Sequence, residues 1–413
     1  MTTRAQLVAS IALAVAVHGL GTLALGSRPI ARLLMRTGEY AFGGALAPRY
    51  VVADVRTYFD YASSAIDGRV PYRDFPVEYP LGAVPVFLLP RLVAGSFGAY
   101  RVAFALEMLL ADAVAVALVA WRVERREGMA RVPGRLAWYS LFLLALGPLP
   151  VARFDLVPTA LAFATALAWA SGRAALGGVA AGVGLLVKLF PAAVLAPVLV
   201  PAVQDAARRR GLRAFGLTVA VGAVAWLGLG GAQVRSSLDY QLGRGLEIEA
   251  VAAGLLIVAA RLGGADLARE FNHSSEELLA PGAAWAASLA LPLQGLALLV
   301  VAARSRTAGR DDGLRSAAAA VLGLMVAGKV LSPQYLIWPI PFIAALEGRT
   351  GRWARPAFLA CCLATSAVFP WAWMGLIQFD PRAVGLLNAR NALLLMLWGL
   401  LLFGPAEVRS EAA

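Results

Sequence analysis

The run YRVAFALEMLLADAVAVALVAW, residues 100–121, decides the fold class of this chain. It is about 20 residues long, which is the length that an α-helix needs to cross the hydrocarbon core of a bilayer. Similar runs recur from end to end, and the 413 residues are 60% hydrophobic and only 15% charged. A soluble chain is about 25% charged. The sequence therefore predicts an all-α, polytopic integral membrane protein that forms a single domain over residues 1–413, because it contains no hydrophilic block long enough to fold alone.

The apolar runs and the arginines between them predict a topology. The candidate spans are residues 5–25, 100–121, 136–151, 154–170, 174–188, 189–203, 212–233, 282–303, 316–330, 333–347, 357–375 and 386–403. Arginine clusters within 122–135, 208–213, 304–315 and 349–355 are expected to face the cytoplasm. Two further apolar stretches, 80–97 and 246–262, would reverse this order if they crossed, so we expect them to be re-entrant or interfacial. About twelve transmembrane helices follow, with both termini inside and residues 5–25 as an uncleaved first helix.

This topology gathers the polar residues on one side of the membrane. Residues 26–99 become a long first outer loop, which includes the re-entrant segment and five carboxylates: Asp54, Asp60, Asp67, Asp74 and Glu78. Further polar groups fall on the same side, namely the turn 153–155, Lys188, the loop 235–282, Lys329 with residues 332–335, and residues 380–382. We therefore expect the site to lie on the extracytoplasmic face.

Several classes of function are not supported by the residue pattern. The net charge of +12 does not indicate nucleic-acid binding, because the basic residues lie in short clusters between apolar runs. The two adjacent cysteines, Cys361 and Cys362, are badly placed to pair with each other. The chain has no P-loop, Rossmann glycine pattern or HExxH motif, and its two histidines are isolated. We expect no cofactor and no metal.

The two lysines stand out among 37 basic residues. Lys188 and Lys329 both lie at the outer ends of apolar runs, and a proline follows each of them shortly. One interpretation is that each side chain snorkels to the interface. The other is that both ammonium groups face an anion, such as a phosphate, in a cavity at the membrane edge, because an intramembrane charge is costly and usually functional.

Several segments resemble a known family of membrane enzymes. DVRTYFDYASSAIDGRVPYRDFPVEYP, residues 54–80, resembles the first outer loop of bacterial polyprenyl-phosphate-dependent GT-C glycosyltransferases, and most closely that of the α-mannosyltransferases of mycobacterial lipid-mannoside synthesis, glycosyltransferase family 87. That loop carries an early Asp, a G-x-x-x-Y segment and a Tyr-Pro-Pro. The counterparts here are Asp54, residues 68–72 and Tyr79-Pro80, with Leu81 replacing the second proline. Four later segments of the chain also resemble segments of the family, namely RFDLVPTALA, GLLVKLFPAAVLAP, GRGLEIEA and VLSPQYLIWPIPF.

The resemblance implies a GT-C helical bundle in the plasma membrane that transfers a sugar, with mannose as the first candidate, to a cell-envelope lipid or glycan. Its polyprenyl-phosphate donor would react with inversion, and Asp54 would be the general base. A carboxylate within about 3 Å of a hydroxyl can take its proton, and fixed cations stabilise the leaving phosphate. The candidate cations, in falling order, are Lys188, Lys329, Arg153 and Arg244. Asp155, Tyr79, Gln334 and Tyr335 are further candidates for contact with substrate.

Three other classes of function stay open at this point. A transporter or flippase of lipid-linked sugars also needs a charged cavity, but it would favour inverted repeats and a two-sided path of charges. A ligase or polymerase of surface polysaccharide shares the architecture and usually takes pyrophosphate-linked glycans. A purely structural membrane protein would have no need for a one-sided polar cluster.

Overall fold

The computed structural model describes residues 3–25, 53–199, 205–307 and 313–405, together with residues 29, 30, 32, 33 and 36. Part of the expected outer loop, residues 37–52, lies outside this description. The described chain is mostly helical, and its two strands form one antiparallel hairpin. The helical content and the long apolar helices confirm the prediction of a helical membrane protein.

The elements of the first half run from α1 to α14. They are α1 (Thr3–Leu25), α4 (Ala53–Ile66), α5 (Ala83–Val93), α6 (Phe97–Glu127), η1 (Met129–Arg131), α7 (Val132–Ala145), α8 (Leu149–Ala152), α9 (Leu156–Ala170), α10 (Ala174–Val187), η2 (Phe190–Leu195), α11 (Ala196–Leu199), α12 (Ala206–Gly230), η4 (Gly231–Gln233), α13 (Val234–Gly243) and α14 (Val251–Gly263).

The elements of the second half begin with the hairpin. They are β1 (Ala268–Asn272), β2 (Ser275–Leu279), α15 (Ala283–Thr307), α16 (Gly313–Val326), η6 (Pro333–Ile337), α17 (Ile340–Ala345), α18 (Gly348–Ser366), η7 (Ala367–Trp371), α19 (Trp373–Ile377) and α20 (Pro381–Phe403).

Within the described residues, five helical runs are long and apolar enough to cross a membrane. They are Thr3–Leu25, Phe97–Glu127, Ala206–Gly243, Ala283–Ser305 and Pro381–Phe403. Five shorter apolar helices, α5, α9, α10, α14 and α16, accompany them. The count of twelve crossings stays a prediction, because the structure holds no membrane against which to place the shorter helices.

Four of the expected spans, 136–151, 189–203, 333–347 and 357–375, are broken within the described residues. Prolines lie at or beside these breaks. Residues 333–347 form the 3₁₀ turn η6 and the short helix α17, and the described part of 189–203 forms η2 and α11. Prolines explain the break, since residues 333, 339 and 341 in one segment and 191 and 197 in the other are all proline. Proline lacks the backbone N–H and clashes with the preceding turn.

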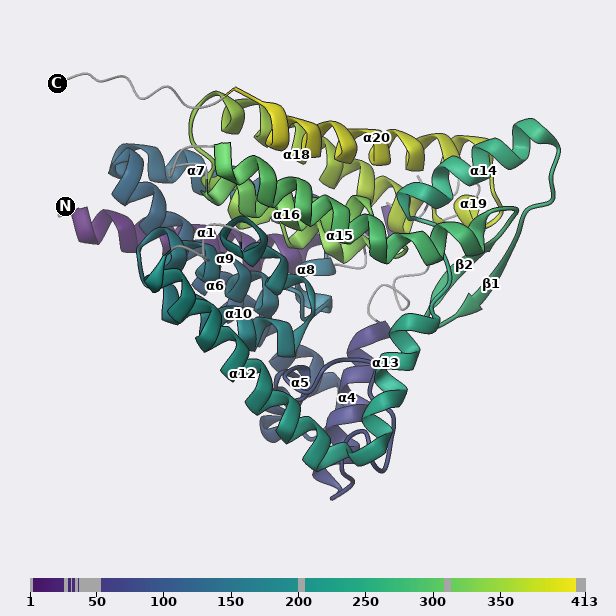
Figure 1. Cartoon of the computed structure of the whole chain (residues 1–413), viewed down its shortest axis with the longest axis horizontal. Helices are drawn as coiled ribbons and strands as arrows, with labels where there is room; N and C mark the ends of the chain where they lie inside the picture. The colour runs from purple at the N-terminus through teal and green to yellow at the C-terminus, as the bar shows by residue number, and fades with distance from the viewer. Residues whose placement is uncertain are drawn as a thin grey trace.

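The helices enclose a roughly triangular outline (Figure 1). α18 and α20 lie side by side along one edge, and α10 packs on α12 along a second. α13 and α4 lie along the third side, while α14 and the β1–β2 hairpin mark the corner between α13 and α20. The described part of the expected outer loop thus includes the helices α4 and α5, which pack against each other.

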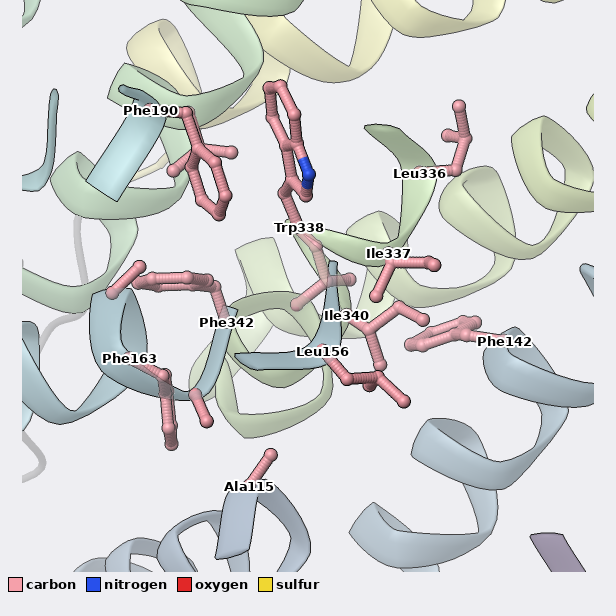
Figure 2. Packing of buried hydrophobic residues seen from close by; sticks show 14 of the residues in the cluster. Ala115, Phe142, Leu156, Phe163, Phe190, Leu336, Ile337, Trp338, Ile340 and Phe342 are labelled. Carbon is pink, nitrogen blue, oxygen red and sulfur yellow. The ribbon is translucent and has the colours of Figure 1, made fainter. Parts of the chain in front are cut away.

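The broken segments pack into the centre of the bundle. Figure 2 shows Phe190 of η2 beside Trp338, which follows η6, and Phe163 of α9 beside Phe342 of α17. The rings of Phe190 and Trp338 stack with centroids 4.0 Å apart, and those of Phe163 and Phe342 meet edge to face at 5.2 Å. Aromatic pairs of this kind stabilise by about 0.5–1.5 kcal/mol beyond burial. They fix the segment after residue 331 against α9.

Small residues bring α10 and α12 together. A Cβ built on Gly178 would lie 1.9 Å from the carbonyl oxygen of Gly211, so only glycine fits at this crossing. Close approach through small residues drives helix association in a bilayer, where burial of apolar surface adds little.

We therefore expect Gly178→Ala to lower the stability of the protein by about 1–3 kcal/mol, because the added methyl overpacks the α10–α12 contact. Gly216→Ala is the matched control, since a Cβ there meets nothing within 4 Å. It should be neutral or stabilising by about 0.5–1 kcal/mol. Thermal unfolding in detergent, followed by tryptophan fluorescence, measures both variants. Equal unfolding temperatures for the two would contradict this packing.

Candidate functional site

Asp54 lies in the first turn of α4 and faces the turn between α8 and α9. Its Oδ2 is 3.0 Å from Nε of Arg153. The Arg153 side chain is 8% exposed, whereas the Asp54 side chain is 35% exposed. A carboxylate in the first turn of a helix is also favoured by the helix dipole. The expected base is therefore anchored by a buried cation and keeps an accessible face.

Lys188 is already paired inside the protein. Its Nζ is 2.7 Å from Oδ1 of Asp155, and the indole N–H of Trp338 donates to the same oxygen at 2.6 Å. The ammonium also lies 4.8 Å from the ring centre of Phe154 and 5.5 Å from that of Tyr335. This cage compensates its charge, so a phosphate would have to compete with Asp155. Lys188 is thus not the strongest of the candidate phosphate ligands.

Lys329 and Glu247 clamp two segments to each other. The Lys329 ammonium donates to the carbonyls of Leu242 and Arg244 at 2.8 and 2.6 Å, and the backbone N–H of Glu247 donates to the Lys329 carbonyl at 2.9 Å. The Glu247 carboxylate accepts from the N–H of Leu331 at 2.6 Å and from the hydroxyl of Ser332 at 2.8 Å. Most of the hydrogen-bonding capacity of Lys329 is thus used to fix the loop that carries Arg244.

Arg244 is the candidate cation with an open donor. Its Nε is buried and has no hydrogen-bond partner among the described residues. Burial lowers the pKa of its guanidinium, but the neighbouring Tyr335 and Glu247 outweigh this and raise the pKa above its ordinary value. A fixed, charged arginine with an unsatisfied buried N–H is well suited to an anion, because such a donor is costly to leave unpaired.

Tyr79 lies at the centre of these groups. Its ring meets that of Phe154 edge to face at 5.0 Å. Its hydroxyl also interacts electrostatically with Asp54, Glu78 and Arg244. The segment that carries Tyr79 is fixed to the end of α10, because the N–H of Gly82 donates to the Leu186 carbonyl at 2.8 Å. A Cβ at Gly82 would lie 2.7 Å from that backbone, so glycine is required.

The remaining candidates lie in η6. The Tyr335 ring stacks on Trp338 with centroids 3.9 Å apart and lies near Arg244. Gln334 is half-buried beside it. The structure thus brings several of the expected residues together: Asp54 pairs with Arg153, Asp155 two residues further on pairs with Lys188, and the Lys188 ammonium faces the ring of Tyr335. The described residues contain no group of three His, Cys, Asp or Glu side chains that could hold a metal ion.

Two carboxylates of this region are not among the residues that the sequence singles out for substrate contact. Glu247 is buried in the clamp, and Glu78 is half-buried next to Tyr79. The one sequence signal for Glu247 is a pair of acids at the start of the apolar stretch 246–262. Glu78 has no signal beyond its place beside Tyr79.

The Lys188–Asp155 pair predicts a specific pattern of stability. We expect Asp155→Asn to cost about 3–5 kcal/mol, because it leaves a poorly solvated ammonium unpaired. The double variant Asp155→Asn with Lys188→Met should recover part of that loss, since the uncompensated charge is gone. Unfolding temperatures of the single and double variants measure this coupling. Losses that simply add would show that the pair does not stabilise the fold.

Comparison with known proteins bears on what this arrangement does. The sequence model of glycosyltransferase family 87 matches residues 77–333, which is more than half of the chain. The match includes the turn at Arg153, both lysines and Arg244, and it begins after Asp54. Searches of the curated proteins and of the solved structures found no match. With its apolar helices and the family match, the chain belongs to glycosyltransferase family 87 and is a membrane glycosyltransferase.

Proposed function

We propose that this protein transfers a sugar, with mannose as the first candidate, from a polyprenyl-phosphate donor to a lipid or glycan of the cell envelope. The observation that carries the proposal is the juxtaposition of an accessible carboxylate, Asp54, with buried cations that have different roles. The family match supports glycosyl transfer, and the resemblance of residues 54–80 supports this donor.

Asp54 acts as the general base in this mechanism. It takes the proton of an acceptor hydroxyl while that oxygen attacks the anomeric carbon of the donor. The bond between the anomeric carbon and the phosphate oxygen breaks on the opposite side, so the configuration is inverted. Arg153 holds the carboxylate in position through the 3.0 Å ion pair, and positioning of this kind supplies much of the rate of a reaction between two bound substrates.

The leaving polyprenyl phosphate gains negative charge as this bond breaks, and Arg244 is the group that stabilises it. The Lys329 ammonium binds the backbone carbonyl of Arg244, and the Glu247 N–H in turn binds the Lys329 carbonyl. Because its backbone is fixed in this way, the Arg244 guanidinium needs little reorganisation. Preorganised donors aimed at developing charge are a large contribution to catalysis. No acid is needed for the leaving group, since a phosphate departs as an anion. A single base is therefore enough.

The base assignment is tested with Asp54→Asn, which keeps the shape of the side chain but cannot accept the proton. We expect transfer from polyprenyl-phosphate mannose to fall by about 10²–10⁴-fold. Asp60→Asn is the matched control, because Asp60 lies on the same helix and pairs with Arg56 at the exposed surface; its activity should stay within about twofold of wild type. Product formation in proteoliposomes measures both.

The outcomes of this assay separate the classes of function. Movement of labelled donor lipid across the bilayer without a glycosylated product would favour a flippase and contradict transfer. Consumption of pyrophosphate-linked glycans alone would favour a ligase. Full activity of Asp54→Asn would remove Asp54 from the mechanism.

The orientation of the site is also a prediction, with the site on the extracytoplasmic side of the plasma membrane. Cys361 and Cys362 are both buried, so single reporter cysteines can be read against a low background. We expect Glu270→Cys, on the exposed strand β1, to react with an impermeant maleimide added to intact cells. Arg210→Cys, at the exposed start of α12, should react only after the cells are opened. The reverse pattern would place the site on the cytoplasmic side.

A further inference from the structure

Glu78 is a second carboxylate at the site, and the mechanism above does not use it. It lies between α4 and α5, where the amide of Gln241 in α13 donates to its carbonyl at 2.9 Å. The hydroxyl of Ser274, at the tip of the β1–β2 hairpin, donates to its Oε1 at 3.3 Å. Three separate parts of the chain therefore meet at this residue, Ser274 at its carboxylate and Gln241 at its backbone.

The surroundings of Glu78 contain unsatisfied polar atoms. The buried Tyr240 hydroxyl lies within reach of the Glu78 carboxylate and the Ser274 hydroxyl, but neither contact has regular hydrogen-bond geometry. Nε of Arg244 is also buried without a hydrogen-bond partner among the described residues. Buried polar atoms of this kind are rare in folded proteins and need an explanation. Other atoms of this kind lie elsewhere in the described residues, but these two lie at the edge of the candidate site, where a polar ligand would complete their hydrogen bonding.

The charges divide the site into two sides. Burial raises the pKa of Glu78 above its ordinary value, and the charge of Asp54 adds to this effect, whereas Tyr240, Ser274 and Arg244 oppose it. Glu78 directly precedes Tyr79, whose ring meets that of Phe154 at 5.0 Å, and the neighbouring Arg153 pairs with Asp54. Two carboxylates in one region would repel a donor phosphate placed beside them. The side formed by the two carboxylates is therefore suited to the acceptor, and Arg244 marks the side of the phosphate.

We infer that Glu78 and the Tyr240 hydroxyl bind a second hydroxyl of the acceptor, next to the hydroxyl that Asp54 deprotonates. A carboxylate accepts hydrogen bonds only, while a tyrosine both donates and accepts, so together they match a sugar or cyclitol hydroxyl. The reacting end of the acceptor must then carry a second hydroxyl within reach of Glu78 and Tyr240. This inference rests on the proposed function for the role of Asp54, and it names the group that selects the acceptor.

The experiment uses the full-length protein in nanodiscs and compares hexyl glycosides of mannose, glucose, galactose and arabinose with hexanol. Binding is measured by tryptophan fluorescence, without donor. We expect wild type to bind at least one glycoside at least tenfold more tightly than hexanol. Glu78→Gln and Tyr240→Phe should each weaken that glycoside by about tenfold, as expected for loss of a hydrogen bond to a charged group, and leave hexanol unchanged.

Turnover supplies a second readout that a structural role would not move. With polyprenyl-phosphate mannose, Glu78→Gln should raise KM for the glycoside about tenfold, while the hydrolysis of donor by water and the KM for donor stay within about twofold. Glu276→Gln is the matched control, since Glu276 lies on the same hairpin and pairs with Arg269 at 2.6 Å instead. It should match wild type in both assays.

The outcomes separate this inference from the proposed function. If wild type binds no glycoside better than hexanol, or if Glu78→Gln and Glu276→Gln behave alike, the role of Glu78 is wrong. If Glu78→Gln lowers donor hydrolysis as much as transfer, Glu78 supports the fold of the site and does not select the acceptor. A wild type that binds glycosides through Glu78 but never consumes the donor would refute the proposed donor and uphold the acceptor site.

Discussion

The turn Arg153-Phe154-Asp155 is the constraint on which the rest of the site depends. Its two charged residues point into separate ion pairs, Arg153 with Asp54 of α4 and Asp155 with Lys188 at the end of α10. Phe154 lies between them and packs against Tyr79 and the Lys188 ammonium. Unpaired charges in such a poorly solvated place are costly, so both pairs must form together. This requirement brings four segments of the chain to one point.

A second set of contacts fixes the opposite wall of the site. Lys329 and Glu247 exchange hydrogen bonds across two loops. On the far side of the same loop, the buried Arg390 of α20 donates to the Glu249 carbonyl at 2.7 Å. The loop 244–250 is therefore held from both sides, which explains how an irregular segment presents Arg244 rigidly. Contacts of this kind satisfy the backbone groups of an irregular segment.

The division of labour among the cations follows from these contacts. Four basic side chains lie near the site, yet Arg153, Lys188 and Lys329 each spend their donors on the protein itself. A site for a phosphate needs a donor that the protein does not use itself, and the buried Nε of Arg244 has no hydrogen-bond partner among the described residues. The two scarce lysines bind to the protein itself in this structure, Lys188 at the turn 153–155 and Lys329 at the loop that carries Arg244.

The sequence by itself determined the class of the protein and proposed candidates for the site, because both depend on local features. Apolar runs such as 100–121 need no partner to be recognised as membrane helices, and the segments around Asp54, Arg153 and Lys188 carry a recognisable order of residues. It did not determine that residues 53–66 form a helix, that 333–347 is broken, or that Glu78 and Glu247 belong to the site. Only the tertiary structure decided which of the four candidate cations bind to the protein itself and which keeps a buried N–H without a partner. The physical reason is that the charge available to a ligand depends on the partners a side chain meets across the fold, and those partners lie far away along the chain.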